Sequence, residues 1–210
     1  MMKVLFMGTP DFAVPTLRAL CEGGYEVIGA ITQPDKPKGR GYQLMPPPVK
    51  VYAAENNIPV YQPSSLKGED FAALLSELDP EVIVVAAYGK ILPAFVLEYP
   101  KYGCVNVHGS LLPEYRGAAP MQRAIIDGKR VTGITTMLMA AGLDTGDMLL
   151  KAEVEIGDDD NFEDIHDRLS VVGADLLIKT LRGIEAGEIV PEVQDDSRST
   201  YAAKIEKSDC

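Results

Sequence analysis

Short apolar runs that alternate with helical segments limit most strongly how this chain can fold. The run from Glu81 to Ala87 holds four branched aliphatic residues in succession, which is typical of a central parallel strand covered on both faces. Strands separated by helices predict an α/β fold whose sheet is mostly parallel. Further strands are expected at residues 3–8, 26–32, 59–61 and 103–108, and helices at residues 11–20, 49–56, 69–78 and 118–127.

One pair of runs breaks this alternation. Residues 132–139 and 147–154 both look like strands, and the short connection 140–146 favours an antiparallel hairpin. Asn161 is a suitable N-cap for a long helix that reaches about residue 186. The fold class that we predict is therefore an open, mostly parallel, Rossmann-like twisted sheet, with helices on both faces and an antiparallel strand near one edge.

Composition narrows the class of protein. Lys and Arg number 20 against 31 Asp and Glu, and this net charge of −11 argues against nonspecific binding of polyanions by the whole surface. No apolar run approaches the roughly 20 residues needed to span a bilayer, and residues 1–8 lack the features of a signal peptide. The three cysteines are widely separated, which indicates reduced thiols and no structural zinc. We expect a cytoplasmic protein without a membrane partner or a metal.

The strand expected at residues 103–108 ends in polar side chains. Asn106 and His108 are two residues apart, so they should project from one face of the strand while Val105 and Val107 pack on the other. Open α/β sheets place functional groups at the carboxyl ends of their strands, which makes this end a candidate site. Cys104 shares the face of His108; a thiol nucleophile is conceivable there, but a buried strand cysteine is the simpler interpretation.

Two loops limit the alternatives. The first βα turn, Gly8 to Asp11, stands where a Rossmann phosphate loop would lie but lacks the glycines of G-x-G-x-x-G. This disfavours a nucleotide-binding Rossmann module without catalysis. Residues 33–48 are rich in Gly and Pro, which predicts no regular structure there, and they carry the short basic cluster Lys36, Lys38 and Arg40.

Six motifs fall in an order and spacing that resemble one family. The motifs are Gly8-Thr9-Pro10-Asp11-Phe12, Gln33-Pro34-Asp35-Lys36-Pro37, Ala87-Tyr88-Gly89, Asn106-Val107-His108-Gly109-Ser110-Leu111-Leu112-Pro113, Arg116-Gly117-Ala118-Ala119-Pro120 and Gly142-Leu143-Asp144-Thr145-Gly146-Asp147. In these motifs the chain closely resembles the amino-terminal domain of the methionyl-tRNA formyltransferase family, from residue 1 to about residue 205.

The resemblance implies transfer of a formyl group from N10-formyltetrahydrofolate to the amino group of methionyl-initiator tRNA. Asn106, His108 and Asp144 match the family's catalytic positions. Attack of an amine on the formyl carbon needs donors for an oxyanion and a proton for the leaving nitrogen, and an amide, an imidazole and a carboxylate can supply both. The folate donor is expected to contact Tyr88, Gly89, Ile91, Leu92, Ser110, Leu111, Leu112, Pro113, Ala140 and Gly142.

The resemblance also bears on the tRNA partner and on the end of the chain. It implies that Phe12 contacts the methionine side chain, and the basic cluster leads us to expect that Arg40 contacts tRNA. We expect residues 1–189 to form a catalytic domain and residues 190–210 a linker toward a second, tRNA-binding domain that is absent here. A monomer is expected. The nearest alternative is another folate-dependent formyltransferase or a formyltetrahydrofolate hydrolase, since both would reuse the same three residues.

Overall fold

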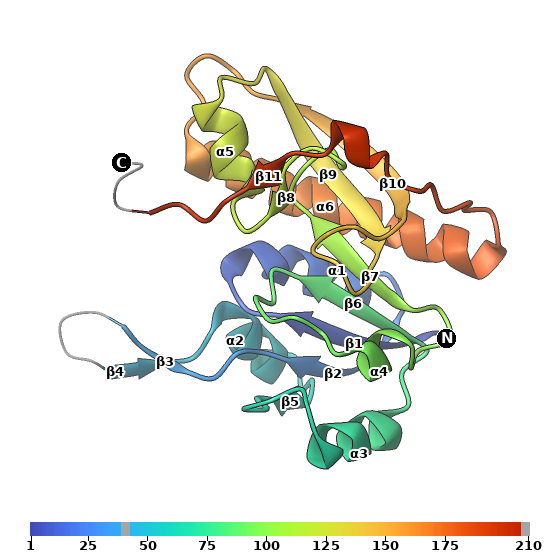
Figure 1. Cartoon of the computed structure of the whole chain (residues 1–210). Coiled ribbons are helices and arrows are strands. Elements are labelled where there is room, and N and C mark those ends of the chain that lie inside the picture. The colour runs from blue at the N-terminus through green and yellow to red at the C-terminus, as the bar shows by residue number, and fades with distance from the viewer. Residues whose placement is uncertain (39–42, 207–210) are drawn as a thin grey trace. The chain divides into compact units, whose positions relative to one another are not determined.

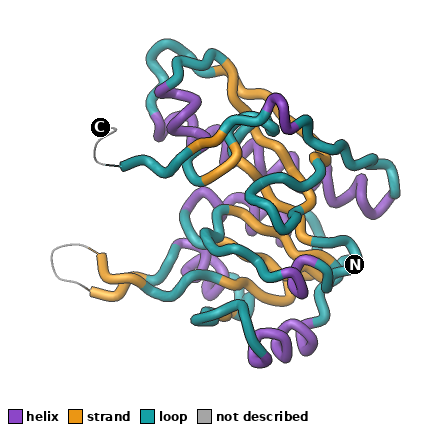
Figure 2. Tube along the Cα trace, in the orientation of Figure 1, coloured by secondary structure: helices purple, strands orange, loops and turns teal. Residues whose placement is uncertain are grey.

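The computed structural model describes residues 1–38 and 43–206. The chain divides into two compact parts, residues 1–106 and residues 107–210, which are described one at a time. Strand β7 (Cys104–His108) begins in the first part and ends in the second. Figures 1 and 2 show strands and helices alternating along the chain, as the sequence predicts.

The first part is built on a parallel sheet. Its strands follow the order β7-β6-β1-β2-β5, and every neighbouring pair in that order is parallel. The other strands in this order are β1 (Lys3–Gly8), β2 (Glu26–Ile31), β5 (Val60–Tyr61) and β6 (Val82–Ala86). The connections between them hold η1 (Asp11–Ala13), α1 (Val14–Glu22), α2 (Pro48–Glu55), α3 (Glu69–Leu78) and α4 (Ala94–Leu97).

Local sequence explains where these elements lie. All five residues of β6 are buried, as the aliphatic run predicts for a central strand. Pro15 and Pro48 stand in the first turns of α1 and α2, where a missing backbone N–H costs no helical hydrogen bond. Helix α3 ends at Asp79, whose φ of 47° is left-handed. Apolar runs therefore set the strands, and proline and a left-handed residue set helix boundaries.

The second part holds an antiparallel pair. Strands β9 (Val131–Leu138) and β10 (Met148–Glu155) form the predicted hairpin, and helix α6 (Phe162–Ala186) packs against both. The side chain of Asn161 accepts hydrogen bonds from the amides of Glu163 and Asp164, and the carboxylate of Asp164 accepts from the amide of Asn161. This capping box fixes the start of α6. The part also contains β8 (Arg116–Gly117), α5 (Pro120–Ile126), η2 (Asp196–Arg198) and β11 (Tyr201–Ala202).

The structure differs from the sequence prediction in the segment 33–48. We expected no regular structure there, but β3 (Lys36–Lys38) and β4 (Gln43–Met45) pair as a short antiparallel ribbon. A proline within a strand is compatible with a two-stranded ribbon, because each strand has one side without a partner. The mostly parallel α/β fold with an antiparallel strand pair is otherwise confirmed.

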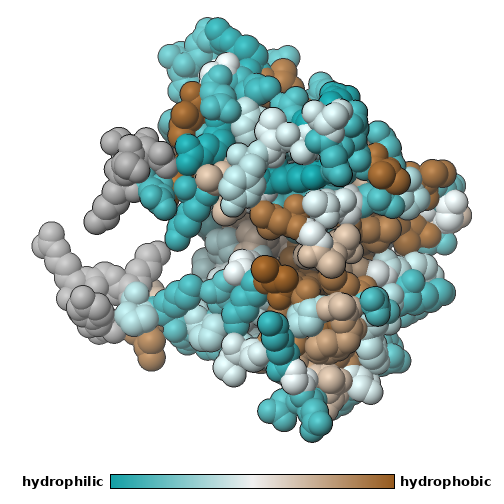
Figure 3. Space-filling model, viewed as in Figure 1, coloured by the Kyte–Doolittle hydropathy of each residue, from teal (hydrophilic) through white to brown (hydrophobic). Residues whose placement is uncertain are grey.

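The surface mixes polar and apolar side chains. The face drawn in Figure 3 carries hydrophobic residues (brown) among hydrophilic ones (teal), which is ordinary because a folded surface still contains much apolar area. Within residues 1–38 and 43–206, none of the helices combines the length and the apolar character that a membrane crossing would need.

Candidate active site

The end of strand β7 carries the two polar residues that the sequence singles out. Asn106 is 9% exposed and His108 is 6% exposed. They stand two residues apart on one strand, so their side chains leave the same face. Burying a polar side chain costs free energy unless the side chain makes hydrogen bonds. The groups that face the two ring nitrogens of His108 therefore indicate its role.

The two ring nitrogens of His108 face different groups. Nε2 lies 2.9 Å from the backbone carbonyl oxygen of Tyr115, and Nδ1 lies 3.8 Å from Oδ2 of Asp144. A carbonyl oxygen can only accept, so Nε2 carries a proton and donates it. Nδ1 is therefore the ring position at which a proton is gained or lost, and it faces a carboxylate. This arrangement suits general acid–base chemistry.

Asp144 is held in an uncommon backbone conformation. Its φ is 50°, in the left-handed region, and its Oδ2 accepts a hydrogen bond of 2.8 Å from the amide of Gly117. Gly117 has a φ of 117°, and a Cβ on it would lie 2.7 Å from the ring of Tyr201. Glycine is therefore required at the residue whose amide holds the carboxylate.

Tyr115 links the histidine to the rest of the second part. Its φ of 58° is rare for a bulky residue and marks local strain, which tends to gather at functional sites. Its amide donates to Oγ1 of Thr200 at 2.8 Å, and its hydroxyl donates to Asp127 at 2.8 Å. Burial, together with that hydrogen bond to Asp127, raises the pKa of Tyr115 above its ordinary value. The residue thus presents its carbonyl to His108 from a fixed position.

The loop that follows His108 is held by one threonine. Thr135 Oγ1 donates to the carbonyl of Ser110 at 2.7 Å and accepts from the amide of Leu112 at 3.0 Å. The side chain of Leu112 packs in a buried cluster with Met137 and Met148. Among the predicted folate residues, Ser110, Leu112 and Pro113 are buried and Leu111 is half-buried. Their side chains serve the core of this part, so a ligand would meet mainly their backbone.

Two other predicted folate residues lie in the connection between β9 and β10. Ala140 and Gly142 are exposed, as is the apolar side chain of Leu143. A Cβ on Gly142 would lie 2.3 Å from Oγ1 of Thr145, so the loop closes tightly at this glycine. Backbone groups in this stretch are accessible beside Asp144.

The predicted folate residues of the first part follow strand β6. Tyr88 is fully buried, and burial raises the pKa of its hydroxyl to about 12. Its backbone carbonyl accepts from Gln33 Nε2 at 2.9 Å and from Thr9 Oγ1 at 3.3 Å. Gly89 has a φ of 80° and stands against the Gln33 side chain. Ile91 is 83% exposed, whereas Leu92 is buried, so only one of these apolar side chains is available to a ligand.

Of the two residues predicted to contact the substrate, Phe12 and Arg40, the structure describes only Phe12. Phe12 is buried within η1, which fits a packing role as well as a contact with a substrate side chain. Arg40 lies outside the described residues. Nearby in sequence, Lys50 Nζ stands 2.8 Å from Asp35, and these hydrogen bonds from Lys50 and from Gln62 hold the pKa of Asp35 below its usual value. This cluster fixes the segment that leads into β3.

Cys104 does not fit a nucleophile. The thiol is buried, and burial raises its pKa to about 12. Its sulfur lies 3.5 Å from the carbonyl of Val96, to which the S–H donates. A thiolate is the reactive form of cysteine, and it is strongly disfavoured in this surrounding.

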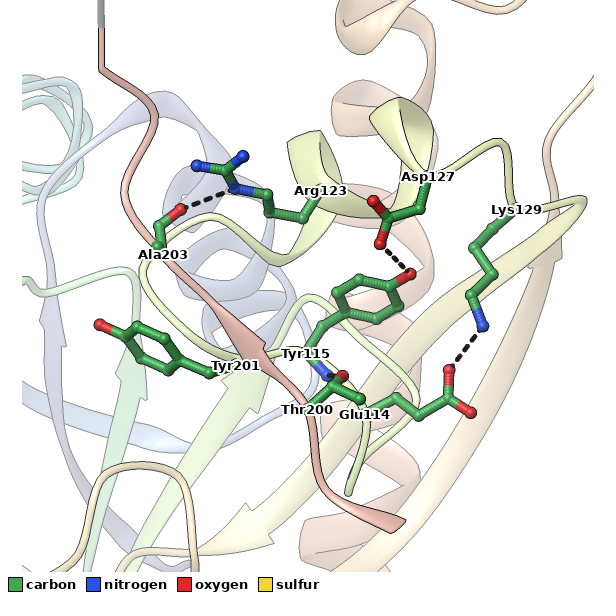
Figure 4. A pocket seen from close by; sticks show the side chains of 8 residues that line it. All are labelled: Glu114, Tyr115, Arg123, Asp127, Lys129, Thr200, Tyr201 and Ala203. Carbon is green, nitrogen blue, oxygen red and sulfur yellow. Dashed lines mark hydrogen bonds and ion pairs between the residues drawn. The ribbon is translucent and has the colours of Figure 1, made fainter. Parts of the chain in front are cut away.

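A pocket of about 620 Å³ in the second part is lined by none of the predicted site residues. Figure 4 shows its charged groups turned toward partners: Lys129 toward Glu114, and Arg123 toward the carbonyl of Ala203. The Tyr115 ring forms one wall, with its hydroxyl on Asp127. Tyr115 therefore both lines the pocket and accepts the hydrogen bond from His108, and the pocket includes none of the residues predicted to bind folate.

One residue that supports the His108–Asp144 pair could not be predicted from the sequence. Gln194 is 7% exposed, and its Nε2 donates to the carbonyls of Asp144 and Gly146, at 2.8 and 2.7 Å. Its Oε1 accepts from Arg116 Nε at 2.9 Å. Gln194 stands in a polar stretch without apolar periodicity, which predicts a linker, so its burial could not be read from the pattern.

Fold and site together define an α/β protein with a histidine–carboxylate pair at the end of a strand. The family model described as formyl transferase matches residues 2–181. The chain therefore belongs to the formyl transferase family.

Two curated relatives carry the same name. The methionyl-tRNA formyltransferase of Citrifermentans bemidjiense is 53% identical over 208 residues, which are 99% of this chain and 65% of that protein. The methionyl-tRNA formyltransferase of Acetivibrio thermocellus is 55% identical over 207 residues, 99% of this chain and 67% of that protein. The resemblance predicted from the motifs is confirmed. The chain spans 65% and 67% of the lengths of these two relatives.

A solved structure shares the fold. Glycinamide ribonucleotide transformylase 1 from Symbiobacterium toebii superposes with a TM-score of 0.74, covering 93% of this chain and 95% of that one. Sequence identity is 20%, so this likeness concerns the fold alone.

Proposed function

We propose that this chain transfers the formyl group of N10-formyltetrahydrofolate to the α-amino group of methionyl-initiator tRNA. The relatives' shared name supports the reaction. The observation that carries the proposal is the orientation of His108, whose Nε2 donates to Tyr115 while Nδ1 faces Asp144. An imidazole fixed in this way is prepared to exchange a proton on one side only.

The reaction needs two proton movements. The amine nitrogen attacks the formyl carbon and forms a new C–N bond, while the formyl oxygen takes up negative charge. The bond from the formyl carbon to N10 of the folate then breaks. The attacking amine loses one proton and N10 gains one, so a base and an acid are both required.

Three residues divide this work in our proposal. Asn106 donates its side-chain amide to the developing oxyanion, a role for which a preorganised donor is the main requirement. His108 carries positive charge near that oxyanion, and the facing carboxylate of Asp144 stabilises the charged ring. Asp144 takes the amine proton, directly or through one water molecule, and returns it by the same route to N10 as the bond to the formyl carbon breaks.

The donor and the acceptor use the other predicted residues. The folate is proposed to lie against the backbone of residues 88–92 and 110–113 and the exposed stretch that holds Ala140 and Gly142. Phe12 and Arg40 remain the proposed contacts for the methionine side chain and for tRNA. We further expect the protein to act as a monomer in the cytoplasm.

An assay with two readouts tests this function. N10-formyltetrahydrofolate labelled in the formyl group is incubated with the chain, with and without methionyl-initiator tRNA. We measure label in tRNA and free formate in parallel, and the His108→Ala chain is the control. Label should appear in methionyl-tRNA and depend on His108. Formate released at the same rate with and without tRNA would instead indicate a hydrolase and would overturn the proposal.

A further inference from the structure

The conformation of the loop around Asp144 needs support from outside the loop. Asp144 has a positive φ, and residues 140–143 before it are exposed. Holding a non-glycine residue in a sparsely populated conformation costs free energy, so the conformation persists only where the surroundings enforce it. The carboxylate itself is anchored by the amide of Gly117. The backbone of the loop is anchored elsewhere.

Gln194 supplies that anchor. Both hydrogens of its side-chain amide are used, one on the carbonyl of Asp144 and one on the carbonyl of Gly146. Its oxygen is taken by Arg116, which also pairs with Asp196 at 2.7 Å. A buried amide whose donors and acceptor are all paired is fixed in one orientation. Gln194 therefore clamps the backbone on either side of Thr145.

The segment that carries Gln194 is itself held against the second part. Met148 and Glu192 exchange two backbone hydrogen bonds of 2.8 Å, which lie just before Gln194. After Gln194, β11 pairs with β8, and Thr200 Oγ1 accepts a hydrogen bond from the amide of Tyr115. The residues that hold His108 and Asp144 in place are thus contacted by one stretch, residues 192–202.

We propose that Gln194 is a positioning residue for Asp144: it holds the left-handed backbone that turns the carboxylate toward His108. The inference rests on the proposed function, because it assigns Gln194 to the geometry of that same pair. It also extends the catalytic unit beyond residue 189, where the sequence led us to place a domain boundary.

The test compares Gln194→Met, which keeps the side-chain length without its hydrogen bonds, with Gln122→Met on α5 as the matched control. Formyl transfer is measured with the 210-residue chain. We expect kcat to fall about 10-fold or more for Gln194→Met, with KM for the folate changed by less than about twofold, since the interaction lost serves the transition state. Gln122→Met should leave both constants unchanged.

A double-variant cycle separates positioning from general stability. When Asp144→Asn is already present, Gln194→Met should lower kcat no further, because both changes disable one group. The chain has only two histidines, so the labelled ring signals of His108 and His166 can be followed directly. Gln194→Met should move the signal of His108 toward its position in Asp144→Asn and leave the signal of His166 in place.

Each other outcome has a definite meaning. An unchanged kcat in Gln194→Met, or losses that multiply in the double variant, would overturn the positioning role. If Gln194→Met does not fold, Gln194→Asn decides in the same assays, since its shorter amide stays polar but withdraws from both carbonyls. If Asp144→Asn alone keeps a normal rate, the catalytic role of Asp144 in the proposed function fails first, and the inference fails with it.

Discussion

The backbone carbonyl of Tyr115 lies 2.9 Å from Nε2 of His108, and this contact decides which ring nitrogen is free to exchange a proton. A histidine alone at a strand end is most often a structural residue. Here the carbonyl fixes the tautomer, and the carboxylate of Asp144 faces the other nitrogen. The pair therefore has the geometry of an acid–base device and not of a packing residue.

Removing the imidazole of His108 should slow the chemical step and leave folate binding nearly unchanged. His108→Ala is expected to lower kcat roughly 100-fold or more, because general acid–base groups contribute about that much. Binding of a folate analogue, measured by titration calorimetry, should change by less than about twofold. His166→Ala is the matched control: His166 lies on α6 and pairs with Asp167, so this variant should turn over normally. Near-normal turnover of His108→Ala would refute the assignment.

Two glycines with positive φ allow backbone strain to be separated from crowding. Gly117→Ala places a Cβ 2.7 Å from the Tyr201 ring and 2.8 Å from the carbonyl of Ala202, whereas Gly128→Ala meets no atom within 4 Å. Gly128→Ala should therefore cost about 1 kcal/mol of unfolding free energy, from its left-handed φ alone. Gly117→Ala should cost roughly 1–3 kcal/mol more from overpacking. Urea titrations of both variants measure the difference in unfolding free energy. Equal losses would contradict the prediction and would show that β8 and β11 can move apart without a cost in stability.

Removing the hydroxyl of Tyr88 and removing that of Tyr115 should have opposite effects on the stability of the fold. The hydroxyl of Tyr88 is buried without a hydrogen-bond partner among the described residues, whereas that of Tyr115 donates to Asp127. Tyr88→Phe should be neutral or stabilise the chain by up to about 1 kcal/mol, because it removes an unpaired polar group. Tyr115→Phe should destabilise it by about 1 kcal/mol. Thermal unfolding of the two variants side by side checks this, and a clear loss in Tyr88→Phe would reveal a partner for its hydroxyl.

Alkaline pH should weaken the fold through groups that are buried in neutral form. Burial raises the pKa of Cys104 from 9.0 to about 12. A raised pKa means that the folded state holds the proton more tightly, so this stabilisation is complete below pH 9 and is lost as the pH rises toward 12. The unfolding free energy of the natural chain should therefore fall more steeply between pH 9 and pH 12 than that of Cys104→Ala. Parallel slopes would contradict the burial of a neutral thiol.

Much of the fold could be predicted because its signals are local. The strands β1 and β6 are apolar runs, and the capping box that begins at Asn161 spans only four residues of the sequence. The ribbon of β3 and β4 was missed because Pro37 and its neighbours normally signal irregular structure. Two-residue strands such as β8 and β11 carry no periodicity at all, so no pattern could have predicted their pairing.

Part of the site could be predicted because it too has a local signal in the sequence. Asn106 and His108 share a strand, so their common face follows from spacing alone. The contact of Gln194 with Asp144 joins residues 50 apart, and its contact with Arg116 joins residues 78 apart. Such contacts depend on the path of the chain in space, which a single sequence does not show. Tyr115 was missed likewise, because its part in the site is played by a backbone carbonyl.

The position of Gln194 also sets an order of events during synthesis. Ribosomes deliver a chain from its first residue onward, and contacts between distant residues form only after both have emerged. Asp144 and His108 are made well before Gln194 and Thr200, which hold them in place. A nascent chain that has reached α6 thus already contains the acid–base pair but not the segment that fixes it. The geometry of the pair would then be completed by one of the last stretches of these 210 residues to leave the ribosome.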